Sequence, residues 1–102
     1  MNYCFHPSAK QELNLAIEYY ENCQQGLGEE FAKEIFATII RITRFPEAWS
    51  ILSENTRRCL TNRFPYGIIY QILDDNILII AVMQLNRSPD YWRVRLKKDD
   101  QK

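Results

Sequence analysis

The sequence has almost none of the residue patterns on which classical enzyme sites are built. His6 is the single histidine, which nearly excludes a histidine-based catalytic triad or a cluster of histidine metal ligands. There is no glycine-rich phosphate loop, no Cys-x-x-Cys and no His-Glu-x-x-His. We therefore expect no metal site and no cofactor, and we expect His6 to be a structural turn residue.

Cysteines and long apolar runs are also scarce. Cys4, Cys23 and Cys59 are odd in number and lack metal-ligand spacing, which argues against a disulfide framework and favours reduced thiols in a reducing compartment. The longest apolar run, 77–83, is far shorter than the roughly 20 residues that span a bilayer. The first residues also lack a basic region followed by an apolar stretch. These features predict a cytoplasmic protein with no membrane partner.

The composition is that of a single small globular domain. Apolar residues make up 46% and charged residues 25% of the 102-residue chain, which is typical of a folded domain rather than of a disordered one. The sequence contains no internal repeat and no linker long enough to separate domains. We expect one domain over residues 1–96 and a charged, frayed tail over 97–102.

The first half of the chain has helical patterning. Residues 1–5 predict a short strand, and Pro7 then suits the first turn of a helix, with Ser8 and Gln11 as an alternative capping box. Apolar residues at helical spacing continue the first helix to about residues 23–25, and the turn 25–28 leads to a second helix over about 28–45. Two amphipathic helices joined by a tight turn predict an antiparallel helical hairpin.

The second half has the patterning of strands. Residues 57–61, 66–73 and 77–84 are the predicted strands, and the last two form a β-hairpin across the turn 74–76. These two strands are apolar at nearly every position, so we expect both faces of the sheet to be close to other structure. The order β-α-α-β-β-β predicts an α+β domain in which an N-terminal strand and a helical hairpin pack on a mostly antiparallel sheet.

Charge is unevenly distributed along the chain although the net charge is zero. Residues 1–50 contain four basic and seven acidic side chains, and residues 51–102 contain nine basic and six acidic ones. This asymmetry indicates a face that meets an anionic partner, although an ordinary mixed surface would also be compatible with it. Guanidinium groups bind phosphate and carboxylate, and aromatic rings stack on bases. The candidate target-binding residues are therefore Arg57, Arg58, Arg63, Arg87, Tyr91 and Trp92. Packing of Trp92 and Tyr91 over the sheet is the structural alternative.

The order of short motifs resembles the RelE/ParE superfamily of toxins, which belong to type II toxin–antitoxin and plasmid-stabilisation systems. The first half contains His6-Pro7-x-Ala9-x-x-Glu12-Leu13, Tyr19-Tyr20 and Gly26-Leu27-Gly28 before Phe31. The second half contains Arg57-Arg58, Phe64-Pro65-Tyr66, Ile68-Ile69-Tyr70, Ile79-Ile80-Ala81-Val82 and Asn86-Arg87-x-Pro89-x-Tyr91-Trp92. Each piece is weak, but together they cover residues 3–95 in a specific order.

The resemblance implies the predicted fold and a growth-inhibiting toxin that a cognate antitoxin wraps and neutralises. The toxin–antitoxin complex is expected to bind operator DNA through the antitoxin. Members of the superfamily divide by target: ParE-like toxins bind DNA gyrase without cutting anything themselves, whereas RelE-like toxins cut messenger RNA on the ribosome. A third alternative is a non-toxic orphan that only binds its antitoxin and represses its own operon.

The RNA-cleaving alternative is only partly supported by the residues. By resemblance its catalytic groups would be Arg58, Arg87 and Tyr91, since arginine and tyrosine can stabilise phosphate charge and move protons. Leu60 stands where a second basic residue would be expected, and Gly67 where the phosphate-binding arginine would be. Gln84 stands where some nuclease relatives have a histidine. These departures favour the non-cleaving, gyrase-binding alternative, so whether the chain is an enzyme stays open.

Overall fold

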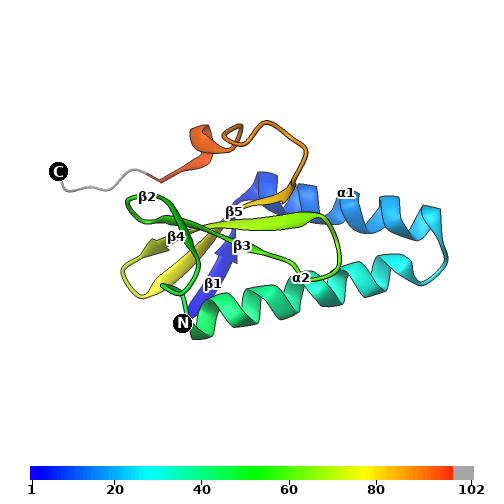
Figure 1. The fold of residues 1–102 in the computed structure, drawn as a ribbon, viewed down its shortest axis with the longest axis horizontal. Coiled ribbons are helices and arrows are strands. Elements are labelled where there is room, and N and C mark those ends of the chain that lie inside the picture. Colours follow the sequence, from blue (N-terminus) through cyan, green and yellow to red (C-terminus); the bar gives the residue numbers. More distant parts are fainter. Residues whose placement is uncertain (98–102) are drawn as a thin grey trace.

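The computed structural model describes residues 1–97 as one α+β unit (Figure 1). The elements follow one another as β1 (Asn2–Phe5), α1 (Pro7–Cys23), α2 (Leu27–Arg44), β2 (Ser50–Ser53), β3 (Thr56–Leu60), β4 (Tyr66–Leu73), β5 (Asn76–Gln84) and the 3₁₀ turn η1 (Arg93–Arg95). The helices lie on one side of the sheet, and the segment after β5 lies on the other (Figure 1). Neither helix in this range is long and apolar enough to cross a membrane.

The sheet has the strand order β1-β5-β4-β3-β2. β1 is parallel to β5, and all the other neighbours are antiparallel. The predicted fold class is therefore confirmed. The predicted element order was short by one strand, because β2 was not expected. This strand is only four residues long and largely exposed, so its sequence lacks the apolar alternation that marks a strand.

The ends of the helices follow from local chemistry. Pro7 is the first helical residue of α1, and the backbone N–H of Ser8 donates to Nδ1 of His6 at 3.0 Å. His6 therefore caps the helix, and the alternative start at Ser8 is not used. Gly26, with φ +89°, begins α2 in a left-handed conformation, and its N–H donates to the carboxylate of Glu21. Such a backbone conformation favours glycine.

Both faces of the sheet are buried, which explains why β4 and β5 are apolar at almost every position. The face under the helices packs residues of α1, α2 and the central strands together; its largest members include Leu13, Phe31, Ile35, Ile39, Ile42, Ile68, Tyr70, Ile77 and Ile79. On the opposite face, Trp92 covers Ile69, Ile80, Ala81 and Met83. The segment after β5 thus completes the domain.

The far end of that segment is also attached to the sheet. The buried side chain of Gln71, in β4, accepts the backbone N–H of Lys97 at 3.0 Å and donates to its carbonyl oxygen at 2.7 Å. Lys97 was expected to begin a frayed tail, but these two bonds hold its backbone. The rest of the predicted tail, 98–102, lies outside the described residues.

Candidate functional site

The six candidate target-binding residues lie at three separate places in the fold. Arg57 and Arg58 are in β3, Arg63 is in the loop between β3 and β4, and the remaining three follow β5. The surroundings of each group decide whether its side chain is available to a partner.

Arg57 and Arg58 point to opposite faces of the sheet, as neighbours on a strand must. Arg57 donates to the backbone carbonyls of Glu47 and Trp49, each at 2.9 Å, so it fastens the connection between α2 and β2. Arg58 pairs with Ile69 on the face away from the helices. Its Nε is buried and has no hydrogen-bond partner within the described chain. Arg58 is therefore the candidate whose charge is least committed to the fold.

Gly67 leaves room for the side chain of Arg58 to lie across the neighbouring strand β4. A Cβ atom at position 67 would lie 3.3 Å from both Cγ and Cδ of Arg58. The missing side chain therefore leaves room for the arginine stem to lie over β4. Gly67 was interpreted as a missing arginine, but in the fold it makes space for the arginine of the neighbouring strand.

Arg63 belongs to the side of the molecule formed by α2. Its Nη1 lies 2.5 Å from Oε1 of Glu30, and its guanidinium lies 5.1 Å from the centre of the Phe64 ring. The carboxylate of Glu34 accepts the backbone N–H groups of Asn62 and Arg63. Two glutamates of α2 thus hold the loop that carries Arg63.

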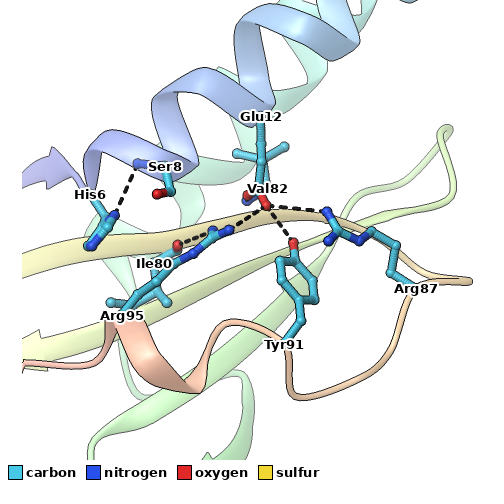
Figure 2. A network of polar contacts seen from close by, with 8 residues as sticks. All are labelled: His6, Ser8, Glu12, Ile80, Val82, Arg87, Tyr91 and Arg95. Atoms are coloured by element: carbon cyan, nitrogen blue, oxygen red, sulfur yellow. Dashed lines mark hydrogen bonds and ion pairs between the residues drawn. The ribbon is translucent and has the colours of Figure 1, made fainter.

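Arg87 and Tyr91 are brought together by Glu12 of α1 (Figure 2). Oε2 of Glu12 accepts the Tyr91 hydroxyl at 2.8 Å and Nη2 of Arg95 at 3.0 Å, and it lies 3.6 Å from Nη1 of Arg87. The guanidinium of Arg87 stacks on the Tyr91 ring at 3.8 Å from its centre. One carboxylate therefore holds two hydrogen-bond donors, Tyr91 and Arg95, and one ion-pair partner, Arg87, and we call these four residues the Glu12 cluster.

The Glu12 cluster also closes an open edge of β5. β1 covers β5 only as far as Ile79. Beyond that point, the backbone N–H of Val82 donates to Oε1 of Glu12 at 3.0 Å, and Nη1 of Arg95 donates to the carbonyl oxygen of Ile80 at 3.1 Å. Side chains from α1 and from the C-terminal segment thus pair backbone groups that a neighbouring strand would otherwise pair.

Burial and the neighbouring Glu12 carboxylate shift the pKa values of two members of this cluster. Burial, followed by the hydrogen bond to the Glu12 carboxylate, raises the pKa of the Tyr91 hydroxyl well above its usual range. Burial alone would lower the pKa of Arg95, but the hydrogen bond and charge of Glu12 raise it overall. At neutral pH Tyr91 therefore keeps its proton and Arg95 its charge.

Trp92 is a packing residue. Its side chain is 1% exposed, and its indole N–H donates to the carbonyl oxygen of Pro89 at 2.8 Å. The structural alternative for Trp92 thus describes its position, and its ring is not available to a partner in this conformation.

The expected single arginine surface is therefore not formed. Only Arg87 and Tyr91 come into contact with each other, and both are joined to Glu12 and Arg95, which were not predicted as site residues. Glu12 stood in the first motif of the sequence, one position before the buried Leu13, but a single acidic residue beside an apolar stripe gives no indication of its partners.

A shallow hollow lies next to the Glu12 cluster. It has a volume of about 230 Å³ and is lined by Glu12, Leu15, Ala16, Tyr19, Tyr66, Val82, Gln84 and Arg87. Leu15 and Tyr19 are large apolar side chains that are more than half exposed. We call this surface the α1 groove, and it joins apolar side chains to the half-exposed Arg87. Within residues 1–97, no group of three histidine, cysteine or acidic side chains could hold a metal ion.

Comparison with known proteins identifies the family. The model of the "ParE toxin of type II toxin-antitoxin system, parDE" matches residues 3–89, which is most of the chain. The chain belongs to the ParE toxin family. No curated protein matches it in sequence.

A solved structure has the same fold as this ParE-family chain. It is described as "Chromosomal ParDE TA system from P. aeruginosa", and it superposes with a TM-score of 0.62 at 14% sequence identity. The superposition covers 84% of this chain and 97% of the other. At so low an identity, the likeness bears on the fold alone.

Proposed function

We propose that this ParE-family chain is a toxin that acts by binding DNA gyrase, and that a cognate antitoxin neutralises it. The observation that supports a binding rather than a cleaving mechanism is the Glu12 cluster. Arg87 already has a carboxylate beside it, and the Tyr91 hydroxyl donates a hydrogen bond to the same carboxylate. Such a pair can contact a partner, but it is poorly suited to proton transfer.

RNA cleavage needs a group that accepts a proton from the attacking 2′-hydroxyl. A general base must give up its own proton near neutral pH, yet burial and Glu12 raise the pKa of Tyr91. The nearby Gln84 carries an amide, which does not titrate. The runner-up, a ribosome-dependent endoribonuclease that uses Arg58, Arg87 and Tyr91, thus lacks a suitable proton acceptor among these residues.

The exposed surface of the molecule offers partners a charged group, Arg87, and the apolar side chains of the α1 groove that Arg87 also lines. Arg87 is 51% exposed, so it can use its other N–H groups to bind a carboxylate of the gyrase target. Leu15 and Tyr19 of the α1 groove present apolar area of the kind that partner proteins cover. We assign this groove to an amphipathic antitoxin segment with acidic residues that face Arg87. The resulting complex would bind operator DNA through the antitoxin.

Inhibition of DNA supercoiling by purified gyrase tests the proposal. The toxin should abolish supercoiling, and primer extension on translating ribosomes should show no cleavage of message. Arg87→Ala should raise the toxin concentration needed for half-inhibition by about tenfold, equivalent to about 1.4 kcal/mol of binding free energy. Arg93→Ala is the matched control, because Arg93 is similarly exposed and sits in a long, local ion pair with Asp90.

The outcomes separate the three alternatives. Message cleavage that depends on Arg87 would establish the ribonuclease and overturn the proposal. An absence of both activities, with retained binding to the product of a neighbouring reading frame, would identify the orphan. Restored growth when that neighbouring product is co-expressed with a gyrase-inhibiting toxin would support the antitoxin half of the proposal.

A further inference from the structure

We infer that Glu12 is the positioning residue of the target-binding surface: its carboxylate places Arg87 and Tyr91 for contact without touching the target itself. The inference rests on the proposed function, since it assigns a role within the same site. It concerns a residue of α1 that is far in sequence from the side chains it holds (Figure 2).

Glu12 itself is held by both β5 and α1. Its Oε1 is held at 3.0 Å by the backbone N–H of Val82, in β5, and its side chain is only 14% exposed. Its backbone belongs to α1, which packs on β5 through the core. The position of Oε2 is therefore set by α1 and β5. It does not depend on the segment after β5, which carries Arg87 and Tyr91.

The loop after β5 forms few hydrogen bonds near Arg87 besides its contacts with Glu12. Its backbone bonds there run from Leu85 N–H to the Pro65 carbonyl and from Arg87 N–H to the Gln84 carbonyl, and the hydroxyl of Ser88 bonds Asp90 locally. None of these bonds directs the side chains of Arg87 or Tyr91. Three contacts set their orientation: those with Glu12, the stacking of the two side chains on each other, and the Arg95 guanidinium, which lies 5.1 Å from the centre of the Tyr91 ring.

Most N–H donors of Arg87 remain available to a target. Arginine has five N–H donors in a planar fork, and one ion pair in the described chain uses a single Nη of Arg87. Because one face of the Arg87 guanidinium stacks on the Tyr91 ring, rotation of the guanidinium is restricted. A pre-oriented fork suits bidentate binding of a carboxylate on the target protein.

A simple deletion of Glu12 would confuse this role with folding. Glu12→Gln alone would leave Arg95, which is 14% exposed, without its counter-charge in a poorly hydrated place. The double variant Glu12→Gln/Arg95→Gln removes both charges together and retains an amide oxygen that can accept the Val82 N–H. The matched control is Arg95→Gln alone, which leaves the Glu12 side chain in place beside Arg87 and Tyr91.

Three measurements on the full chain test the inference: the urea midpoint of unfolding, the ¹⁵N heteronuclear NOE of the Arg87 Nε–Hε group, and half-inhibition of gyrase supercoiling. We expect the double variant to remain folded, to show a mobile Arg87 side chain, and to inhibit gyrase at least tenfold more weakly than Arg95→Gln. Arg95→Gln, which shares the loss of the Arg95 charge, should keep a rigid Arg87 and is the reference for inhibition.

The outcomes distinguish this inference from the proposed function. A folded double variant that inhibits as well as Arg95→Gln would overturn the positioning role. A wild-type chain that does not inhibit gyrase would defeat the proposed function, and the NOE would then decide about Glu12 alone. In that case an Arg87 side chain that stays rigid in the double variant would overturn the inference, and one that becomes mobile would support it.

Discussion

At the scale of single residues, Gly28 determines how closely the two helices approach each other. A Cβ atom at this position would lie 2.6 Å from the backbone oxygen of Ile17 and 2.9 Å from Cβ of Glu21. Because the first of these atoms is backbone, α1 itself would have to shift. We predict that Gly28→Ala lowers the free energy of unfolding by about 2–3 kcal/mol, measured by urea denaturation at neutral pH.

The control for this prediction lies on the same helix. Lys33 is highly exposed and forms only a surface ion pair with Glu29, so Lys33→Ala should change stability by less than about 0.5 kcal/mol. A Gly28→Ala variant as stable as Lys33→Ala would show that the helices can separate at little cost.

Single residues also show where prediction from the sequence ended. Pro7 and Gly26 were correctly placed at helix starts and turns, because proline and glycine restrict or release the backbone locally. The role of Glu12 could not be predicted, since its partners lie 70 to 83 positions away in the chain. Tertiary contacts of this kind depend on the fold, which local patterns specify only indirectly.

At the scale of elements, the segment after β5, residues 85–97, is attached to the rest of the fold near both ends, by Glu12 and by Gln71. We call this segment the clasp. Gln71 is 2% exposed and bonds both backbone groups of Lys97. We predict that Gln71→Leu, which has similar volume but no polar atoms, costs about 1–3 kcal/mol, because buried backbone groups lose their partners. Trp92 belongs to this segment and is buried against the sheet, so its fluorescence should shift to longer wavelength if the clasp opens.

The conservative variant Gln71→Glu separates the clasp from simple packing. An ionised glutamate can still accept the Lys97 N–H, but it places a buried negative charge against the carbonyl oxygen of Lys97, so at neutral pH it should destabilise the fold at least as much as Gln71→Leu despite its matching shape. Identical fluorescence and stability in all three proteins would contradict the two-ended attachment.

The elements themselves were predicted to different degrees. Both helices were recovered within one or two residues at each end, because their apolar stripes recur at helical spacing over four turns or more. β4 and β5 were clear from β-branched and aromatic residues beside a turn. β2 was missed because a short edge strand has no buried face along most of its length, and sheet pairing with β3 rather than local sequence defines it.

At the scale of the whole molecule, the uneven charge of the sequence is partly balanced within the fold. Acidic side chains of the first half hold basic ones of the second: Glu12 holds Arg87 and Arg95, and Glu30 holds Arg63. The asymmetry was interpreted as one basic face for a partner. That interpretation missed the intramolecular pairing, because charge counts along a chain carry no information about which groups meet in space.

Buried tyrosines make the folded state of the whole molecule less stable at alkaline pH. Burial raises the pKa of Tyr66 to about 12 and raises the pKa values of Tyr70 and Tyr91 further, whereas an unfolded chain titrates near 10. Above about pH 10 the unfolded chain therefore releases protons that the folded chain keeps, and stability must fall as pH rises toward 12. Burial also raises the pKa of the Cys59 thiol, and this effect has the same sign.

We predict that the urea midpoint is nearly constant from pH 7 to 9 and then decreases from pH 10 onward. Tyr66→Phe should reduce the steepness of that decrease, because one proton fewer is retained on folding. Absorbance at 295 nm should show the corresponding loss of a late-titrating phenol. A midpoint that stays level between pH 9 and 11 would mean that these hydroxyls are already hydrated in the folded state, and that the core around Tyr66 opens without unfolding.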